Sequence, residues 1–328
     1  MNNFFKISLI FGLSLMAYSC AVEKDESAEE IEKRVIDSYI TVIHKDSLNP
    51  SESGLYTIVK AKGSGAEVVD SSYVYVTYST RDLKGNYLST TDQEVAKRVG
   101  TYSVANYYGP YLIQTSVNSL IRGVEEGLEK KRVGGEYSFI IPSWLSDYGY
   151  TGSNKTHSSP VIYDFKIHRV IKDIEKFESD SLRSYSNKYY AGLDTTKADF
   201  YFKVTRATNG DSVKVGDVIN YYYVGKLLNG FVFDTNIEDT ARKYGIYSST
   251  KQYTAASYTV VDPDNATEAE DPNNSVISGV SLSFLKMKYG EKAITFFSSL
   301  YGYGNQEKNF GIYQPLFFEI EVVEKPSN

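Results

Sequence analysis

Alternating apolar positions predict a chain built mainly of short β-strands. Val74, Val76 and Tyr78 recur at a period of two, which places one side of a strand against a core. Glycine turns such as Lys84-Gly85 separate the apolar runs, as they do between neighbouring strands. Further β-type runs occupy residues 138–141, 161–170, 218–224, 293–297 and 316–323.

Helical spacing appears in two longer segments outside these runs. Apolar residues recur three and four positions apart over 31–43 and again over 174–189, where Gly192 provides a stop signal. Among the strands, only 119–128 and 279–286 leave room for a short helix. The pattern therefore predicts an N-terminal helix, a connecting helix, and one short helix in each strand-rich region, which is an α+β arrangement.

The chain contains a diverged internal repeat. The tyrosine and glycine at positions 78 and 85 return at 223 and 230, an offset of 145. An apolar pair followed by x-Gly occurs at 120–124 and again at 276–280, an offset of 156. Three later landmarks, at 135, 148–149 and 160–164, occur again 155 residues further on. Five landmarks in one order indicate duplication of a domain-sized unit. We call residues 54–172 the first repeat and residues 199–324 the second repeat.

Composition excludes several classes of protein. Hydrophobic residues make up 41% and charged residues 23% of the 328 positions, which is ordinary for a globular protein. The net charge of -6 argues against a nucleic-acid partner held by phosphate neutralisation. One Cys and three scattered His provide no metal-ligand spacing, so we expect neither a metal nor another cofactor.

The N-terminus is typical of an exported protein. An apolar stretch, 7–18, is too short to span a bilayer but suits a signal peptide. The run Ala17-Tyr18-Ser19-Cys20 resembles a bacterial lipobox, with Tyr18 bulkier than usual. The resemblance implies cleavage before Cys20, its lipidation, and a lipid-anchored protein of the outer membrane, on either its periplasmic or its surface side.

An acidic run follows Cys20, and two interpretations of it stay open. Residues 23–30 read Glu-Lys-Asp-Glu-Ser-Ala-Glu-Glu. Like charges extend a chain, so the run suits a solvated tether. It also resembles the acidic export signal of surface lipoproteins in the Bacteroidetes.

Both repeats carry motifs of one enzyme family. Residues 216–235 place Gly-Asp before a strand, then Tyr-x-Gly-x-Leu, a glycine turn and Phe233-Asp234. This resembles the opening of an FKBP-type peptidyl-prolyl isomerase domain. Residues 120–128, with an apolar pair, x, Gly and a helix, resemble that family's central segment. The resemblance implies two domains, each a twisted antiparallel sheet around a short helix. The predicted organisation is 1–19 signal peptide, 20–53 acidic tether and N-terminal helix, 54–172 first domain with a degenerate pocket, 173–198 helical linker, and 199–328 second domain.

The resemblance also implies a prolyl pocket in the second repeat. Its catalytic residues would be Tyr223, Phe233, Asp234, Ile277, Tyr303 and Phe318, and its substrate-binding residues Val276, Val280 and Tyr258. Val280 replaces the tryptophan that usually forms the pocket floor. In the first repeat the matching residues are Tyr78, Leu120, Ile121, Tyr148 and Tyr163, but Leu88-Ser89 stands where Phe-Asp belongs.

Two functions follow as hypotheses. The first is isomerisation of X–Pro bonds in exported polypeptides, which needs neither ATP nor a cofactor, with the second repeat as the active one. The alternative is a non-catalytic lipoprotein that binds unfolded chains, a partner protein or a glycan. The acidic segment 262–272 lacks the glycine and ligand pattern of a calcium loop and reads as a surface excursion near the pocket rim.

Overall fold

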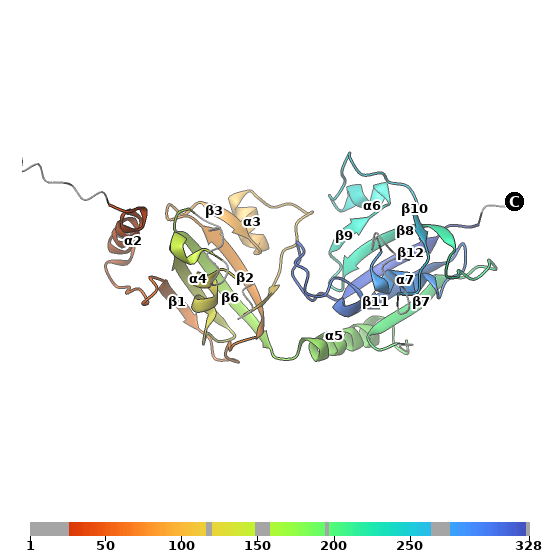
Figure 1. Ribbon diagram of the computed structural model, residues 1–328, viewed down its shortest axis with the longest axis horizontal. Helices are drawn as coiled ribbons and strands as arrows, with labels where there is room; N and C mark the ends of the chain where they lie inside the picture. Colours follow the sequence, from red (N-terminus) through yellow and green to blue (C-terminus); the bar gives the residue numbers. More distant parts are fainter. Residues whose placement is uncertain (1–25, 116–119, 148–157, 194–196, 264–275, 326–328) are drawn as a thin grey trace, which may run out of the picture. The chain divides into compact units, whose positions relative to one another are not determined.

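The computed structural model describes residues 26–115, 120–147, 158–193, 197–263 and 276–325 (Figure 1). The chain divides into two compact parts, Met1–Ser47 and Leu48–Asn328. Cys20, Tyr148 and most of the excursion 262–272 lie outside the described residues. None of the helices within these ranges combines the length and the apolar character that a membrane crossing requires.

Helix α2 (Ala28–His44) forms in the N-terminal part, as the apolar spacing predicted. Its start is fixed by a capping box, in which the Ser27 hydroxyl accepts from Glu30 N–H at 3.2 Å and the Glu30 carboxylate accepts from Ser27 N–H at 2.8 Å. Ile36 and Ile40, four residues apart on one face, are buried.

The two repeats fold into two antiparallel sheets with the same strand order. In the first, β1, β5, β6 and β2 lie in that order, and β3 and β4 both pair with β2. In the second, β7, β11, β12 and β8 take the same places, and β9 and β10 both pair with β8. The bounds are β1 Tyr56–Lys62, β2 Tyr73–Arg81, β3 Tyr87–Thr90, β4 Tyr111–Gln114, β5 Gly135–Ile141, β6 Val161–Ile171, β7 Phe200–Arg206, β8 Val218–Leu227, β9 Val232–Thr235, β10 Ala256–Thr259, β11 Lys292–Phe297 and β12 Leu316–Val322. This order confirms the duplication.

Individual contacts repeat along with the strands. Arg81 on β2 donates to Asp164 on β6, with Nε and Oδ2 2.8 Å apart. The corresponding pair across β8 and β12 is Lys226 with Glu319. The two sheets therefore keep the same cross-strand ion pair at equivalent places, although all four residue identities differ.

Within the described residues, each repeat contains two short α-helices rather than the single one predicted. The predicted helices are α4 (Arg122–Leu128) and α7 (Ser278–Phe284), each followed after a strand by a 3-10 turn, η1 (Ser143–Leu145) or η2 (Ser299–Tyr301). The helices missed are α3 (Gln93–Val99) and α6 (Glu238–Lys243). Each buries a single alanine, so no apolar period announces it. Polar capping by Asp92 and a left-handed Gly100 bound α3 instead.

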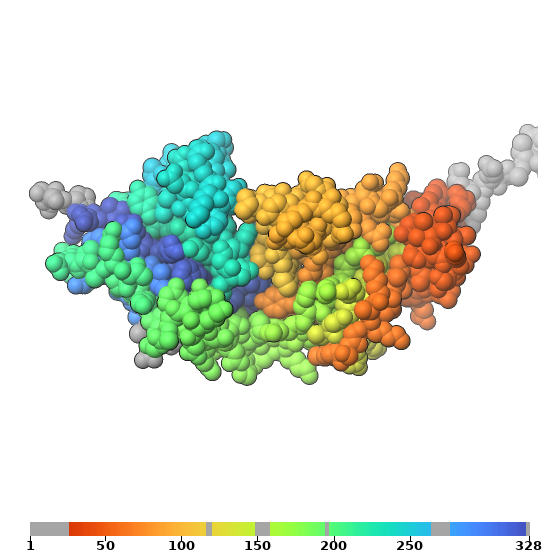
Figure 2. Space-filling view, turned by 180° about the vertical axis from the view of Figure 1, so that it is seen from behind, coloured from red at the N-terminus to blue at the C-terminus, as the bar shows by residue number. Residues whose placement is uncertain are grey.

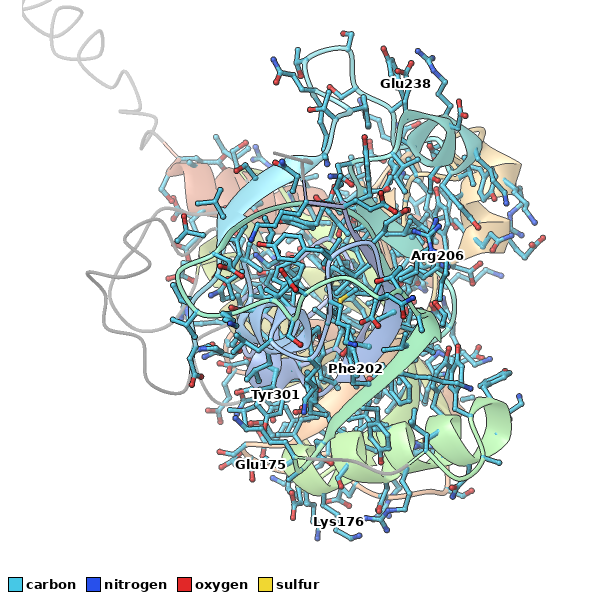
Figure 3. All side chains as sticks on the ribbon, turned by 90° about the vertical axis from the view of Figure 1, so that its right-hand side faces the viewer. Glu175, Lys176, Phe202, Arg206, Glu238 and Tyr301 are labelled. Atoms are coloured by element: carbon cyan, nitrogen blue, oxygen red, sulfur yellow. The ribbon has the colours of Figure 1, made fainter. Side chains whose placement is uncertain are left out.

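The predicted linker helix, α5 (Ile174–Tyr189), packs against the outer face of the second sheet (Figure 1). Leu182 is fully buried there, and the Tyr185 ring meets the edge of Phe296 on β11 at 5.3 Å. Lys176 lies on the opposite side of the helix, away from the sheet (Figure 3). The helix is thus part of the packing of the second repeat.

Close contact between α7 and its sheet requires Gly279. A Cβ at this position would lie 2.4 Å from the Phe297 ring on β11. We expect Gly279→Ala to lower the free energy of unfolding by about 1–3 kcal/mol, because the ring has to move or the helix has to lift. Urea unfolding would measure this, and adding Phe297→Leu should restore part of the loss. An unchanged midpoint for Gly279→Ala alone would contradict the packing described.

Candidate functional site

Separate elements of the second repeat bring the predicted pocket residues together. Tyr223 comes from β8 and Phe318 from β12, while Phe233 and Asp234 come from β9. Ile277 immediately precedes α7, with its carbonyl accepting from Val280 N–H at 3.0 Å. The buried members of this cluster are Val280, Tyr258 and Phe318, and the half-buried ones packed against them are Tyr223, Phe233, Val276, Ile277 and Tyr303.

Aromatic rings form the walls of the site. Phe233 meets Phe318 edge to face, with ring centroids 5.8 Å apart, and approaches Tyr303 at 6.4 Å. Sequence reasoning missed one wall residue, Phe310, whose ring lies 5.0 Å from Phe233. Phe310 is only 3% exposed, yet it lies in a polar segment where no apolar period marks it.

The glycine of the Tyr-x-Gly motif allows these rings to meet. A Cβ on Gly225 would lie 2.8 Å from Phe233 and 2.9 Å from Phe318. Gly225 is therefore required for the aromatic contact between β9 and β12. The equivalent position in the first repeat is Thr80, where no such contact has to be accommodated.

Asp234 is the polar centre of the site. Its carboxylate accepts from the Tyr223 hydroxyl at 2.6 Å and forms an ion pair with Lys251. Burial first, and then the Asp234 carboxylate, hold the pKa of Tyr223 well above its usual range. Tyr223 therefore stays protonated and acts as a donor. Lys251 was not predicted, because it lies seventeen residues along the chain from Asp234 with no motif linking them.

Two donors remain available for a ligand. Burial and Asp234 raise the pKa of Tyr303, so its hydroxyl keeps its proton. No hydrogen bond links that hydroxyl, or the Ile277 N–H, to any other described residue. A cluster of apolar side chains that carries two unused donors can receive the carbonyl oxygen of a peptide.

Tyr258 and Val280 lie behind the aromatic walls. The Tyr258 ring packs against Phe284 of α7 at 5.7 Å, and its hydroxyl is 3.1 Å from the Ser281 hydroxyl. The Tyr258 hydroxyl is therefore engaged in a hydrogen bond within the core. Val280 is buried, and it stands where the family resemblance led us to expect a tryptophan.

Comparison with known proteins identifies this architecture. Residues 210–323 match the family model of the FKBP-type peptidyl-prolyl cis-trans isomerases. The second repeat is an FKBP-type domain. A similar curated protein is a probable FKBP-type peptidyl-prolyl cis-trans isomerase from Haemophilus influenzae, 37% identical over 65 residues, which are 19% of this chain. The matched region spans 26% of that relative's length.

Similar solved structures also carry FKBP or isomerase names. The three FKBP domains of wheat FKBP73 are 16% identical, with 85% of this chain and 98% of that chain covered and a TM-score of 0.30. An isomerase from Pseudomonas syringae is 18% identical, with coverages of 47% and 96% and a TM-score of 0.33. FkpA from Escherichia coli is 21% identical, with coverages of 51% and 71% and a TM-score of 0.31.

The first repeat has a different site. Tyr78, Leu120, Ile121 and Tyr163 pack in or against one core, and Tyr148 lies outside the described residues. Ser89, at the place of Asp234, is 2.8 Å from the Thr80 hydroxyl. Leu88, at the place of Phe233, is 56% exposed. Among the residues described in this repeat, neither an aromatic side chain at the place of Phe233 nor a carboxylate at the place of Asp234 is present.

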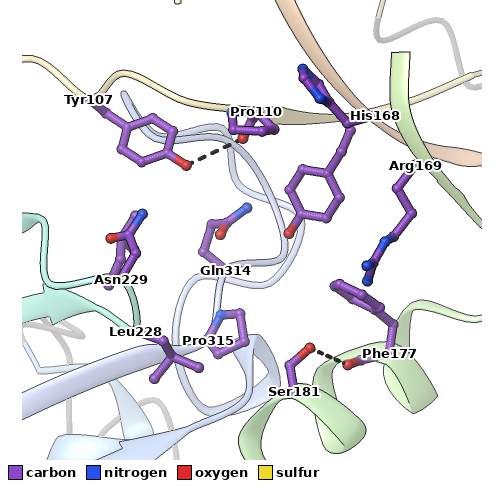
Figure 4. Close-up of a pocket in the computed structure, with 12 residues that line it drawn as sticks. Tyr107, Pro110, His168, Arg169, Phe177, Ser181, Leu228, Asn229, Gln314 and Pro315 are labelled. Carbon is purple, nitrogen blue, oxygen red and sulfur yellow. Dashed lines mark hydrogen bonds between the residues drawn. The ribbon is translucent and has the colours of Figure 1, made fainter. Parts of the chain in front are cut away.

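Hollows of Leu48–Asn328 include one of about 300 Å³ that is lined by Tyr223, Ile294 and Glu321, among others. Another of about 390 Å³ is lined by Tyr75, Phe177, Leu228 and Pro315, among others, and by none of the predicted pocket residues (Figure 4). A search of the described residues finds no group of three His, Cys, Asp or Glu side chains placed to hold a metal ion.

Proposed function

We propose that this protein is a peptidyl-prolyl cis-trans isomerase that assists the folding of exported proteins, and that its second repeat is the active one. The observation that carries the proposal is the contrast between the repeats. Phe233 and Asp234 meet Phe318, Tyr303 and Tyr223 in the second repeat. The equivalent Leu88 and Ser89 form neither contact in the first.

The chemistry requires no nucleophile. An X–Pro amide resists rotation because of its partial double bond, with a barrier of about 18–20 kcal/mol. A pocket that binds the twisted amide more tightly than the planar one lowers that barrier. Phe233 and Phe318 would enclose the proline ring and keep water away. The Tyr303 hydroxyl and the Ile277 N–H would hold the neighbouring carbonyl oxygens, and Asp234 would keep Tyr223 oriented at the rim.

Binding of polypeptides without isomerisation is the second candidate, and Val280 favours it. A valine floor presents less surface to a proline ring than the tryptophan usual in the family, which weakens the grip on the twisted amide. Such a protein would act as a holding chaperone or bind a partner. Accelerated isomerisation is the property that separates the two functions.

The deciding experiment measures catalysis by the chain that starts at residue 21. It would be assayed on X–Pro peptides with varied X and on a protein whose refolding is limited by proline isomerisation. Acceleration, reduced by Tyr303→Phe, supports the enzyme. A folded protein that binds these chains without accelerating either process would support the binding function instead.

We further propose that the protein is anchored in the cell envelope through a lipid on Cys20. The apolar stretch before Cys20 and the acidic run after it support this. In a bacterial host with lipoprotein processing, we expect the full chain to partition with membranes and Cys20→Ser to lose both the lipid mass and the partitioning. Membrane association that survives the substitution would contradict the anchor.

A further inference from the structure

A loop of the second repeat is closed by stacked tyrosines. After α6 the chain runs through 244–253, a protruding edge of the second repeat (cyan in Figure 2). The rings of Tyr247 and Tyr253 stack, with centroids 5.2 Å and planes 14° apart. The Arg242 guanidinium lies 3.6 Å from the centre of the Tyr247 ring. The Tyr253 hydroxyl accepts from Ser248 N–H at 2.9 Å. We call Arg242, Tyr247 and Tyr253 the tyrosine clasp.

The clasp has its own support on α6. Arg242 donates from Nε and one terminal nitrogen to Glu238 at 2.9 and 2.6 Å, one turn earlier on the helix. This holds the guanidinium over the tyrosine ring. An aromatic pair and a cation–π contact both stabilise the loop in which they form. Together they can order a short polar loop that has little apolar surface to bury.

Lys251 is carried by this loop, between the two tyrosines in sequence. Its ammonium forms the ion pair with Asp234 and lies 5.9 Å from the centre of the Tyr223 ring. At the loop end, the Asn236 amide donates to the Thr254 carbonyl at 3.1 Å. Fixing a lysine side chain costs conformational entropy, so a surface ion pair forms best when its backbone is already ordered.

The first repeat contains the same clasp without its lysine. The Lys97 ammonium lies 5.6 Å from the Tyr102 ring centre, and Tyr102 stacks on Tyr108 at 5.4 Å and 21°. The Tyr108 hydroxyl accepts from Ser103 N–H at 3.1 Å. Each of these positions precedes its counterpart in the second repeat by 145, but the counterpart of Lys251 is Asn106.

This difference shows that the clasp and the lysine are separate features of the loop. The first repeat has Ser89 in place of Asp234, so a cation at position 106 would have no carboxylate to meet. The clasp therefore forms independently of the ion pair. In the second repeat, the equivalent loop carries Lys251, and the Lys251 ammonium pairs with the Asp234 carboxylate.

We propose that the tyrosine clasp is a positioning device: it holds Lys251 on Asp234 and thereby sets the charge that the second repeat's pocket presents to residues flanking a bound proline. This inference rests on the proposed prolyl site. Consecutive residues lie 3.8 Å apart, and charges act over about 8–10 Å at physiological salt, so side chains next to the proline are within reach. With Lys251 in place, the Asp234 charge is neutralised and does not repel acidic flanking residues. Without it, Asp234 is uncovered and basic ones gain.

The test compares two proline peptides that differ only in having Glu or Lys before the proline. For each, kcat/KM and the binding constant are measured with the chain from residue 21. We expect Lys251→Met to lower the Glu-to-Lys preference about threefold to tenfold, and 0.5 M salt to shrink that change. Lys251→Arg should retain the preference. Lys308, whose ammonium lies 4.2 Å from the Tyr303 ring centre, is present in every variant, so its charge does not affect the difference in preference between variants.

The clasp itself is tested by Tyr247→Ala, with Tyr102→Ala in the first repeat as matched control. We expect Tyr247→Ala to shift the preference in the same direction as Lys251→Met, by a smaller factor, and Tyr102→Ala to leave it unchanged. Equal loss for both peptides in Lys251→Met, or no shift in Tyr247→Ala, would overturn the inference. If the wild type binds both peptides without isomerising them, the enzyme proposal fails, while the binding preferences still decide the inference.

Discussion

Replacing Phe233 by alanine is expected to lower the isomerase kcat/KM of this protein about tenfold to a hundredfold. The ring touches Phe318, Phe310 and Tyr303, so it forms a wall shared by three other aromatic side chains. Truncation removes about 1.5–3 kcal/mol of apolar contact, and each 1.36 kcal/mol of lost transition-state binding is a factor of ten in rate. The loss appears in kcat/KM because an opened wall also readmits water to the amide.

Leu88→Ala is the matched control for this substitution. Leu88 occupies the equivalent place in the first repeat and is 56% exposed, so its truncation should change neither activity nor stability appreciably. Phe233→Leu keeps apolar volume and should retain part of the activity, which guards against a folding defect as the cause. Activity that survives Phe233→Ala but disappears in Leu88→Ala would place catalysis in the first repeat and contradict our assignment.

The strands and helices could be predicted well from the sequence because duplication makes each landmark residue pattern occur twice. A single tyrosine or glycine is weak evidence for a fold, but Tyr223 and Gly230 repeat the residues at positions 78 and 85 with the same spacing. The strands and both central helices followed from the apolar pattern and such pairs, whereas the gathering of Phe233, Asp234 and Phe318 was predicted from the family resemblance. Gly225 and Gly279 then turn out to be the positions where ring contacts forbid a Cβ.

What the sequence could not predict depends on contacts without a period. Helices α3 and α6 bury one alanine each, so neither has an apolar face that a sequence pattern could mark; Asp92 and Gly100 bound α3, whereas no side chain caps the start of α6. Phe310 reaches the pocket from an irregular segment, and Lys251 reaches Asp234 from a loop whose order comes from ring stacking. Such long-range polar pairs carry no spacing rule. The offset of 145 between the clasps is a signal visible in the sequence, but only the structure shows what those tyrosines do.

The buried carboxyl of Glu178 links α5 to the segment that leads to Tyr303. Glu178 is 3% exposed, and its carboxylate accepts from Ser299 N–H at 3.0 Å and from the Ser299 hydroxyl at 2.8 Å. Burial raises its pKa to about 7, because the two hydrogen bonds only partly offset the loss of water, and the charges of Asp199 and Glu175 add to the rise. The helix and η2 are therefore joined through a group that titrates near neutral pH.

The stability of the protein should consequently fall as pH rises through this range. The folded state keeps the Glu178 proton up to a pH of about 7, whereas the unfolded chain releases it near 4.5. Folding is thus favoured below 4.5, and the advantage declines between 4.5 and 7 and stays lost above. At 1.36 kcal/mol per pH unit, this amounts to about 3 kcal/mol.

Glu178→Gln removes this titration and keeps a group that can bond to Ser299. Urea unfolding at several pH values between 4.5 and 8 should show wild-type stability declining relative to the Glu178→Gln variant by about 3 kcal/mol, with the difference changing mainly below pH 7. Glu52→Gln, at an exposed position that does not act on Glu178, is the control and should follow the wild type. Parallel curves for wild type and the Glu178→Gln variant would show that the carboxyl ionises in the folded protein as readily as in the unfolded chain. In that case the two Ser299 hydrogen bonds would fully replace the lost water, and α5 would hold η2 equally well at every pH.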